Sequence, residues 1–246
     1  MSRLQELQER RAFECRLTPD RALETIDEAA VWVAERGLVE ITPCCSIPSL
    51  HTACHEEPYT PGGRGFAAYP KTKYPWGFEL GSRPGLHALQ IHRGKRLLVT
   101  TAVAALVDPL AREAIVTATG ADRSFLDHLA AAGPSTTEEI GEELGLDARP
   151  LRRRFERLGA IVTRSIVVAT AGGGHRHTAE LRRWDQVFPE APAGPAGLEE
   201  LVVAAVRAAV VAPEDELRRW FSWPLAVIPE RLERPAPGWV AAPASA

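Results

Sequence analysis

No run of consecutive apolar residues in this sequence approaches the ~20 that a membrane-spanning helix requires. Residues 2–11 are mostly charged and polar, which fits a surface helix and not a secretory signal peptide. Cysteine is scarce, with four residues in 246, and without an export signal we expect thiols or metal ligands and not a disulfide framework. We therefore expect a cytoplasmic protein with no membrane partner.

Lysine is nearly absent, with 3 Lys beside 26 Arg, a skew that genome base composition can produce by itself. The formal net charge is -3 and the sequence pI is about 6.2. The whole molecule therefore does not attract nucleic acid, and only a local basic patch could do so. With 45% hydrophobic and 25% charged residues, the composition is that of an ordinary globular protein and excludes a disordered or fibrous chain.

The region 124–184 has the layout of three short helices followed by a hairpin. An apolar-periodic run predicts the first helix, which ends at the Gly-Pro pair 133–134. Ser135 or Thr136 is a good N-cap for the second helix, at 137–144, whose first turn is acidic, as the helix dipole favours.

The third helix is predicted at 149–158, with Pro150 at a position that helices tolerate. A β-branched run at 161–168, glycines at 172–174 and a return segment ending at Trp184 predict a Gly-tipped hairpin. Three helices and a hairpin in this order are typical of a winged helix, a module that most often binds nucleic acid.

Positive charge is concentrated in the third helix, because 149–164 contains six arginines and one acid, Glu156. A recognition helix enters the major groove with such a face. The residues expected to contact duplex DNA are those of this helix, the hairpin and an earlier basic turn: Arg149, Arg152, Arg153, Arg154, Arg157, Arg164, His175, Arg176, His177, Arg93 and Lys95. Winged helices also bind proteins, so a protein partner is the alternative.

The chain divides by pattern into three parts. Residues 1–120 form an N-terminal helical and irregular domain with a candidate cleft, because 38–85 is too rich in Pro and Gly for long elements and long irregular stretches are usually functional. Residues 121–188 form the winged helix, and 198–246 a C-terminal helical unit that reads as a degenerate second winged helix. The predicted fold is α+β, mostly α with small β-wings, in tandem winged helix-turn-helix modules.

The C-terminal unit is predicted to contain three helices. The clearest is at 198–211, a second opens at 213–215 and runs through 221, and 224–232 could supply a third. Beyond them, 238–240 offers a possible strand.

Several short motifs follow one another along the chain: RGLV at 36–39, IPSL at 47–50, WGFEL at 76–80, RGK at 93–95 and LRRWFSW at 217–223. With the winged-helix pattern between the last two, the chain resembles the AlkZ-type, also called YcaQ-type, winged-helix DNA glycosylases, and more closely the shorter AlkZ-related proteins. That superfamily builds a DNA-binding cleft from tandem winged-helix units. The resemblance covers most of the chain and implies DNA binding, with a role in DNA repair.

In the glycosylases, a Gln-apolar-Gln or Gln-apolar-Asp element after the first helices positions the water that attacks the sugar carbon as an alkylated base leaves. The corresponding stretch here is Glu40, Ile41 and Thr42, and a similar QIH sequence at 90–92 lies outside the family's position. By this resemblance Glu40 is the candidate catalytic residue, as a general base or a stabiliser of an oxocarbenium-like centre. The chain is then a DNA-binding relative without the amide motif or an active glycosylase.

The segment 44–55 holds five soft or borderline metal ligands in twelve residues: Cys44, Cys45, His51, Cys54 and His55. Zinc could use four of them and is the one cofactor the sequence suggests, although adjacent cysteines are awkward to direct to one ion. The alternatives are small buried cysteines with histidines that line a cleft or contact DNA, and a reactive thiol next to a histidine.

Overall fold

The structure, a computed structural model, describes residues 1–92, 95–169, 174–191 and 193–243. Its helices alternate with three antiparallel sheets of three strands each, so the chain is α+β, as expected. Across these residues, none of the helices has both the length and the apolar character needed to cross a membrane.

The central sheet positions the first functional residues. It has the strand order β1-β3-β2, from β1 (Leu38–Glu40), β2 (Leu86–His92) and β3 (Lys95–Thr100). On one side of β3, Leu97 pairs with Glu40, and on the other side it pairs with Leu89. The register of β2 then shifts between Leu89 and His92, an irregularity of the kind that turns a side chain toward a new direction.

Only short elements interrupt the region between β1 and β2, as its Pro and Gly content predicts. They are α3 (Leu50–Ala53), the 3₁₀ turn η2 (Gly65–Ala68) and α4 (Trp76–Leu80). The N-terminal helices that precede this sheet are α1 (Arg3–Glu14) and α2 (Ile26–Arg36), joined by the 3₁₀ turn η1 (Pro19–Arg21).

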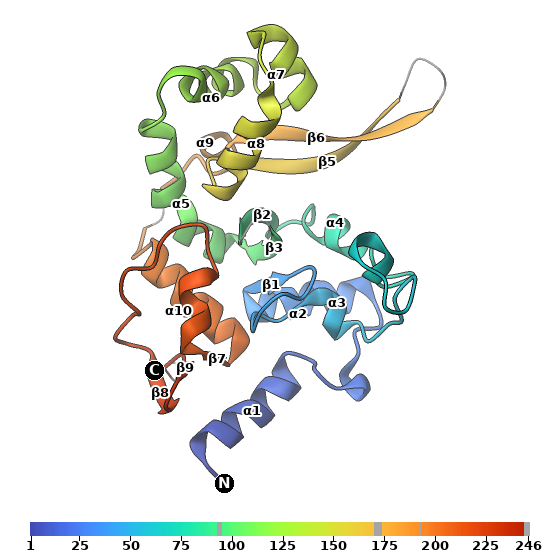
Figure 1. The fold of residues 1–246 in the computed structure, drawn as a ribbon, viewed down its shortest axis with the longest axis vertical. Coiled ribbons are helices and arrows are strands. Elements are labelled where there is room, and N and C mark those ends of the chain that lie inside the picture. The colour runs from blue at the N-terminus through green and yellow to red at the C-terminus, as the bar shows by residue number, and fades with distance from the viewer. Residues whose placement is uncertain (93–94, 170–173, 192, 244–246) are drawn as a thin grey trace.

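The predicted three helices and hairpin are confirmed in the following unit. Its elements are α6 (Gly120–Ala132), β4 (Ser135–Thr136), α7 (Thr137–Leu144), α8 (Ala148–Arg157), β5 (Ile161–Ala169), β6 (His175–Arg183) and α9 (Trp184–Val187). The N-cap of α7 is Thr136, in a capping box with Glu139, and Asp147 caps α8 by accepting from the amide of Arg149 at 3.1 Å. Figure 1 shows the β5–β6 hairpin extending away from the helices.

The C-terminal part is less helical than the sequence predicts. It contains α10 (Leu198–Ala209), β7 (Val211–Pro213), the 3₁₀ helix η3 (Glu214–Arg219), β8 (Glu233–Ala236) and β9 (Trp239–Ala241). The helix expected at 213–221 is thus a 3₁₀ helix. The prediction of a helix at 224–232 is wrong, because the structure has no helix there. Prolines at 224 and 229 interrupt that segment, and the Arg218 guanidinium donates to the carbonyls of Leu225 and Ala226 at 3.0 Å each.

One hydrophobic core connects all three parts. The helix α5 (Thr101–Val116) links the central sheet to the helical unit and also packs against α10. The core contains Val107 of α5, Phe155 of α8 and Val206 of α10, each at most 1% exposed. The division of the chain into domains at 120 and 188 stays a prediction.

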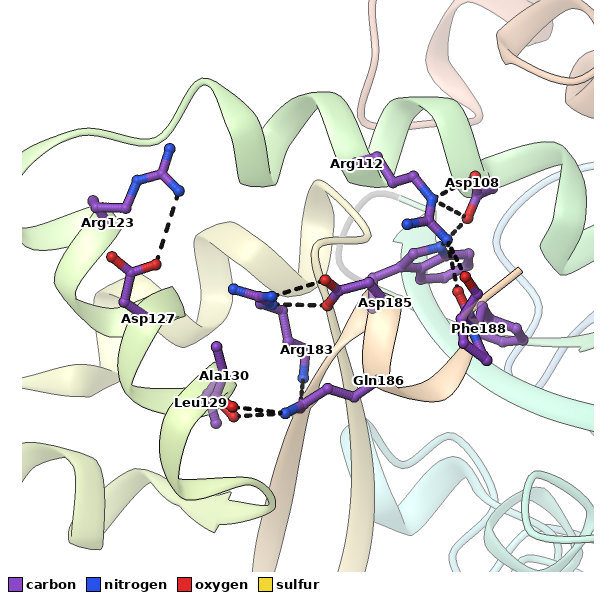
Figure 2. A network of polar contacts seen from close by, with 12 residues as sticks. Asp108, Arg112, Arg123, Asp127, Leu129, Ala130, Arg183, Asp185, Gln186 and Phe188 are labelled. Carbon is purple, nitrogen blue, oxygen red and sulfur yellow. Dashed lines mark hydrogen bonds and ion pairs between the residues drawn. The ribbon is translucent and has the colours of Figure 1, made fainter. Parts of the chain in front are cut away.

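A polar network fixes the end of the hairpin to the helices around it (Figure 2). The indole nitrogen of Trp184 donates to the buried Asp108 of α5 at 2.8 Å, and Arg112 donates to the same carboxylate and to the carbonyl of Phe188. The amide of Gln186 donates to the carbonyl of Leu129 on α6 at 2.9 Å. The helical unit is therefore anchored to α5 by specific hydrogen bonds as well as by apolar packing.

Candidate nucleic-acid interface and a thiol cluster

Three arginines of α8 form an exposed stripe, which we call the arginine stripe: Arg149, Arg153 and Arg157. A spacing of four residues places them on one face of the helix. The opposite face buries Phe155, whose ring stacks on Phe125 of α6 at a centroid distance of 5.7 Å. Within the described part of the chain, no stripe arginine belongs to an ion pair. These guanidinium groups are therefore available to a ligand.

The other two arginines of α8 are engaged within the protein. Arg152 Nε donates to Glu156 Oε1 at 2.9 Å, and Glu156 is 5% exposed and also accepts from Thr163 Oγ1 at 2.6 Å. Arg154 Nη1 lies 2.5 Å from Asp122 Oδ2 on α6. The arginines of α8 thus divide into three stripe residues without an ion-pair partner among the described residues and two residues with one. Arg152 pairs with Glu156 of the same helix, and Arg154, although exposed, pairs with Asp122 of α6.

The stripe lies along two surface grooves. One groove, of about 490 Å³, is lined by the stripe together with Arg152, Glu156, Gln90 of β2 and the start of α7. The second, of about 880 Å³, is lined by the stripe, Pro150 and Ser222 from the C-terminal part. All three stripe residues line both grooves, so the stripe forms the ridge between them.

A third groove, of about 330 Å³, runs between the hairpin and the segment from α4 to β2. Its walls include Arg164 and Arg182 from the hairpin and Arg96 from β3. Burial and the positive charge of Arg152 lower the pKa of Arg96, and the negative charge of Glu156 partly offsets them. Burial is the largest of these effects, so the pKa of Arg96 lies below its usual range.

The remaining residues expected to contact DNA are only partly described. Lys95 and His175 are exposed. Arg93 lies outside the described residues, as do the side chains of Arg176 and His177 and two glycines of the predicted tip, Gly172 and Gly173.

A second site forms around the buried carboxylate of Glu40, which is 0% exposed. Three donors converge on its Oε1 atom: His92 Nε2 at 2.8 Å, Cys45 Sγ at 3.0 Å and Cys44 Sγ at 3.2 Å. The other oxygen, Oε2, accepts from the backbone amide of Cys44 at 2.8 Å. We call these four residues the thiol cluster; one ligand-type atom from each lies within 4.8 Å of all the others.

The loop after β1 brings both thiols back to Glu40. The amide of Glu40 donates to the carbonyl of Pro48 at 2.8 Å, so the chain returns to the edge of β1 and places Cys44 and Cys45 above it. The amide of Ser46 then donates to Glu216 of η3 at 2.9 Å, which holds the loop against the C-terminal part.

Electrostatics in the thiol cluster favour an ionised Glu40 beside a neutral Cys45 thiol. Burial alone raises the pKa of Glu40, but hydrogen bonds from His92 and the two cysteines outweigh it and keep that pKa below its usual range. Burial, together with the charge of Glu40, raises the pKa of the Cys45 thiol far above its usual range.

The five predicted metal ligands do not converge. Cys44 and Cys45 join Glu40 and His92, whereas the other three lie elsewhere, because Ser49 caps α3 and this turn leads the chain away from the cluster. Cys54 is buried in the core around Leu50, and burial raises the pKa of its thiol to about 12. His55 Nε2 lies 2.8 Å from the carbonyl of Arg16.

Sequence reasoning missed His92 as a member of this site. The signal was the QIH sequence at 90–92, whose histidine stands 52 residues after Glu40 and has no local link to the cysteines. Only the pairing of β1 and β2 on opposite sides of β3 brings it there.

His51 is buried at 8% exposure, and both ring nitrogens have no hydrogen-bond partner among the described residues. Burial lowers its pKa from 6.5 to about 4. Between pH 6.5 and about 4, the His51 ring is therefore protonated in the unfolded chain but stays neutral in the folded chain. Stability should fall as the pH drops from 6.5 to 4 and this loss should then level off, with a total of about 3 kcal/mol from this residue.

The check is the free energy of unfolding of wild type and His51→Leu at pH values from 7 to about 4, read from urea titrations. We expect the gap between the two proteins to change by about 3 kcal/mol over this range, to the disadvantage of wild type at acid pH. Parallel curves would mean that the ring has the same pKa in the folded and unfolded chains and would contradict this prediction.

The geometry of the thiol cluster argues against a direct catalytic role for Glu40 in this arrangement. Its carboxylate meets no solvent, and Cys44 and Cys45 would have to move before a DNA base could reach it.

Comparison of the chain with protein-family models, curated proteins and solved structures finds no match in any of the three.

Proposed function

We propose that this protein binds duplex DNA through its helical unit at 120–187, used as a winged helix. In this proposal α7 and α8 form the helix-turn-helix, α8 is the recognition helix and the β5–β6 hairpin is the wing. The proposal extends to a distant relationship with the AlkZ-type glycosylases, on the motifs given above. Tandem use of a second winged helix in the C-terminal part has less support, since α10 is the one α-helix among the described residues after 197.

The observation that carries the proposal is the arginine stripe. Arg149, Arg153 and Arg157 are exposed on one face of α8, belong to no ion pair in the described part of the chain, and line grooves on both sides. Guanidinium groups bind phosphate oxygens with two parallel hydrogen bonds, and such contacts supply most of the affinity of a protein for the DNA backbone. The overall charge of -3 means that binding would depend on this local patch.

The test is a salt series with the full chain and a generic fluorescent duplex. If the three stripe arginines neutralise three phosphates, the slope of log K against log salt is about -2.7, and affinity falls roughly 40-fold between about 50 and 200 mM salt. Binding that does not respond to salt, or no binding at about 50 mM, would refute the proposal.

A parallel assay under the same conditions distinguishes a binding protein from a glycosylase. A second duplex carrying an alkylated guanine is incubated in parallel and assayed for release of free base. The burial of Glu40 favours binding without release. Release that disappears in Glu40→Gln would instead support the glycosylase alternative.

A further inference from the structure

We propose that Glu40, Cys44, Cys45 and His92, the thiol cluster, bind one Zn²⁺ ion. The ligand atoms would be Glu40 Oε1, the two Sγ atoms and His92 Nε2, which already face one another. This set differs from the one that the sequence suggests, and the inference does not depend on DNA binding.

The distances suit a tetrahedral ion. Zinc–ligand bonds of about 2.0–2.3 Å place tetrahedral ligand atoms roughly 3.3–3.8 Å apart. In the structure, His92 Nε2 lies 2.8 Å from Glu40 Oε1, 3.1 Å from Cys44 Sγ and 3.8 Å from Cys45 Sγ. The two thiols lie 3.2 and 3.0 Å from Glu40 Oε1. Shifts of less than about 1 Å would therefore open these atoms around an ion.

The chemistry of the four atoms selects the metal. Two sulfurs, one imidazole nitrogen and one carboxylate oxygen are ligands for a borderline-soft cation such as Zn²⁺, and not for Mg²⁺ or Ca²⁺, which take oxygen. On binding, the two thiols release their protons and the resulting thiolates bind the ion. The His92 ring then carries its proton on Nδ1, which has no hydrogen-bond partner among the described residues, and Nε2 offers its lone pair to the ion in place of its hydrogen bond to Glu40.

Backbone amides around the cluster are placed to hold these ligands. The amide of Ile47 donates to Cys45 Sγ at 3.4 Å, a contact that stabilises a thiolate. The amide of Cys44 occupies Glu40 Oε2, which leaves Oε1 as a single-oxygen ligand. Phe221 packs edge-on against the His92 ring at 6.3 Å between centroids. With four protein ligands the site has no open position for a substrate, which is typical of a structural zinc site. The ion would link the loop after β1, through Cys44 and Cys45, to β2, through His92.

The experiment uses the full chain purified without chelator, with metal measured by mass spectrometry. A second sample is stripped with chelator and titrated with Zn²⁺ while the melting temperature is followed. We expect one equivalent of zinc and a rise in melting temperature of about 5–10 °C at free Zn²⁺ 100 times Kd. Addition of Co²⁺ in place of Zn²⁺ should give the thiolate charge-transfer absorption of a cysteine-ligated ion.

Matched variants locate the ion. Cys44→Ser changes an exposed residue, so the protein should still fold, and zinc affinity should fall by more than the roughly 10–100-fold that loss of an outer-shell partner costs. Cys54→Ala removes a thiol of the other predicted set and should leave the zinc equivalent unchanged. The proposal is overturned if neither sample binds zinc, if Co²⁺ gives no thiolate absorption, or if Cys44→Ser retains wild-type affinity.

Discussion

Replacing Arg149, Arg153 and Arg157 together with glutamate is expected to weaken duplex DNA binding at least about 100-fold at about 50 mM salt. Three lost phosphate contacts of about 1 kcal/mol each account for this factor, and repulsion between the new carboxylates and the phosphates adds to it. The slope of log K against log salt should also approach zero, because no counterions are released at the stripe. Fluorescence anisotropy across the salt series measures both quantities.

The variant avoids the two arginines with structural roles. Changing Arg152 would leave the buried Glu156 without its ion-pair partner, and changing Arg154 would break its contact with Asp122 on α6. Either substitution could reduce binding by loosening α8. The stripe arginines have no such partners in the part of the chain that the structure describes, so the fold should persist in the triple variant.

A matched control carries the same change in net charge at a distance from α8. Arg3 and Arg10 lie on α1 and Arg207 on α10, in the lower half of Figure 1, and all three are exposed. Their triple replacement with glutamate should leave affinity within about threefold of wild type, since long-range charge is screened at these salt concentrations. Equal losses in both triple variants would mean that binding depends on net charge and not on the stripe.

The helical unit was predictable because its signals are local. The capping box at Thr136, the apolar spacing that buries Phe155 and the β-branched run of β5 each act over a few residues, and each gives the element that the sequence indicates. Which arginines of α8 lack an ion-pair partner was only partly predictable. Glu156 follows Arg152 by four residues on the same helix, but Asp122, the partner of Arg154, comes from α6.

The thiol cluster shows why sites formed by distant residues are hard to read. A window of twelve residues suggested five ligands, but α3 turns three of them away, and the fourth member of the cluster comes from β2. Strand pairing of β1 and β2 through β3, and the register shift before His92, are set by the packing of the whole sheet. Of the C-terminal sheet, the sequence indicated only the strand at 238–240, which is β9, because its partner β7 lies across a long irregular segment.

The second large effect is expected at Asp108, where substitution with alanine should lower the free energy of unfolding by about 2–4 kcal/mol. Asp108 is 3% exposed and accepts from Trp184 Nε1 at 2.8 Å and from Arg112 Nε at 2.8 and 2.9 Å (Figure 2). Alanine would leave the fully buried indole N–H of Trp184 without an acceptor and Arg112 without its carboxylate. Asp108→Asn should cost less, because an amide oxygen can still accept from the indole.

A double-mutant cycle with Trp184→Phe separates the two contributions. In the background that carries Trp184→Phe there is no indole donor to leave unpaired, so the cost of Asp108→Ala should shrink by about 1–2 kcal/mol. The remaining cost belongs to Arg112, whose side chain is one-third exposed and can recover hydrogen bonds to water. Urea titrations of the four proteins give the cycle. A cost for Asp108→Ala that is the same in both backgrounds would mean that the indole hydrogen bond adds nothing to stability, and that the helical unit is anchored to α5 by packing and Arg112 alone.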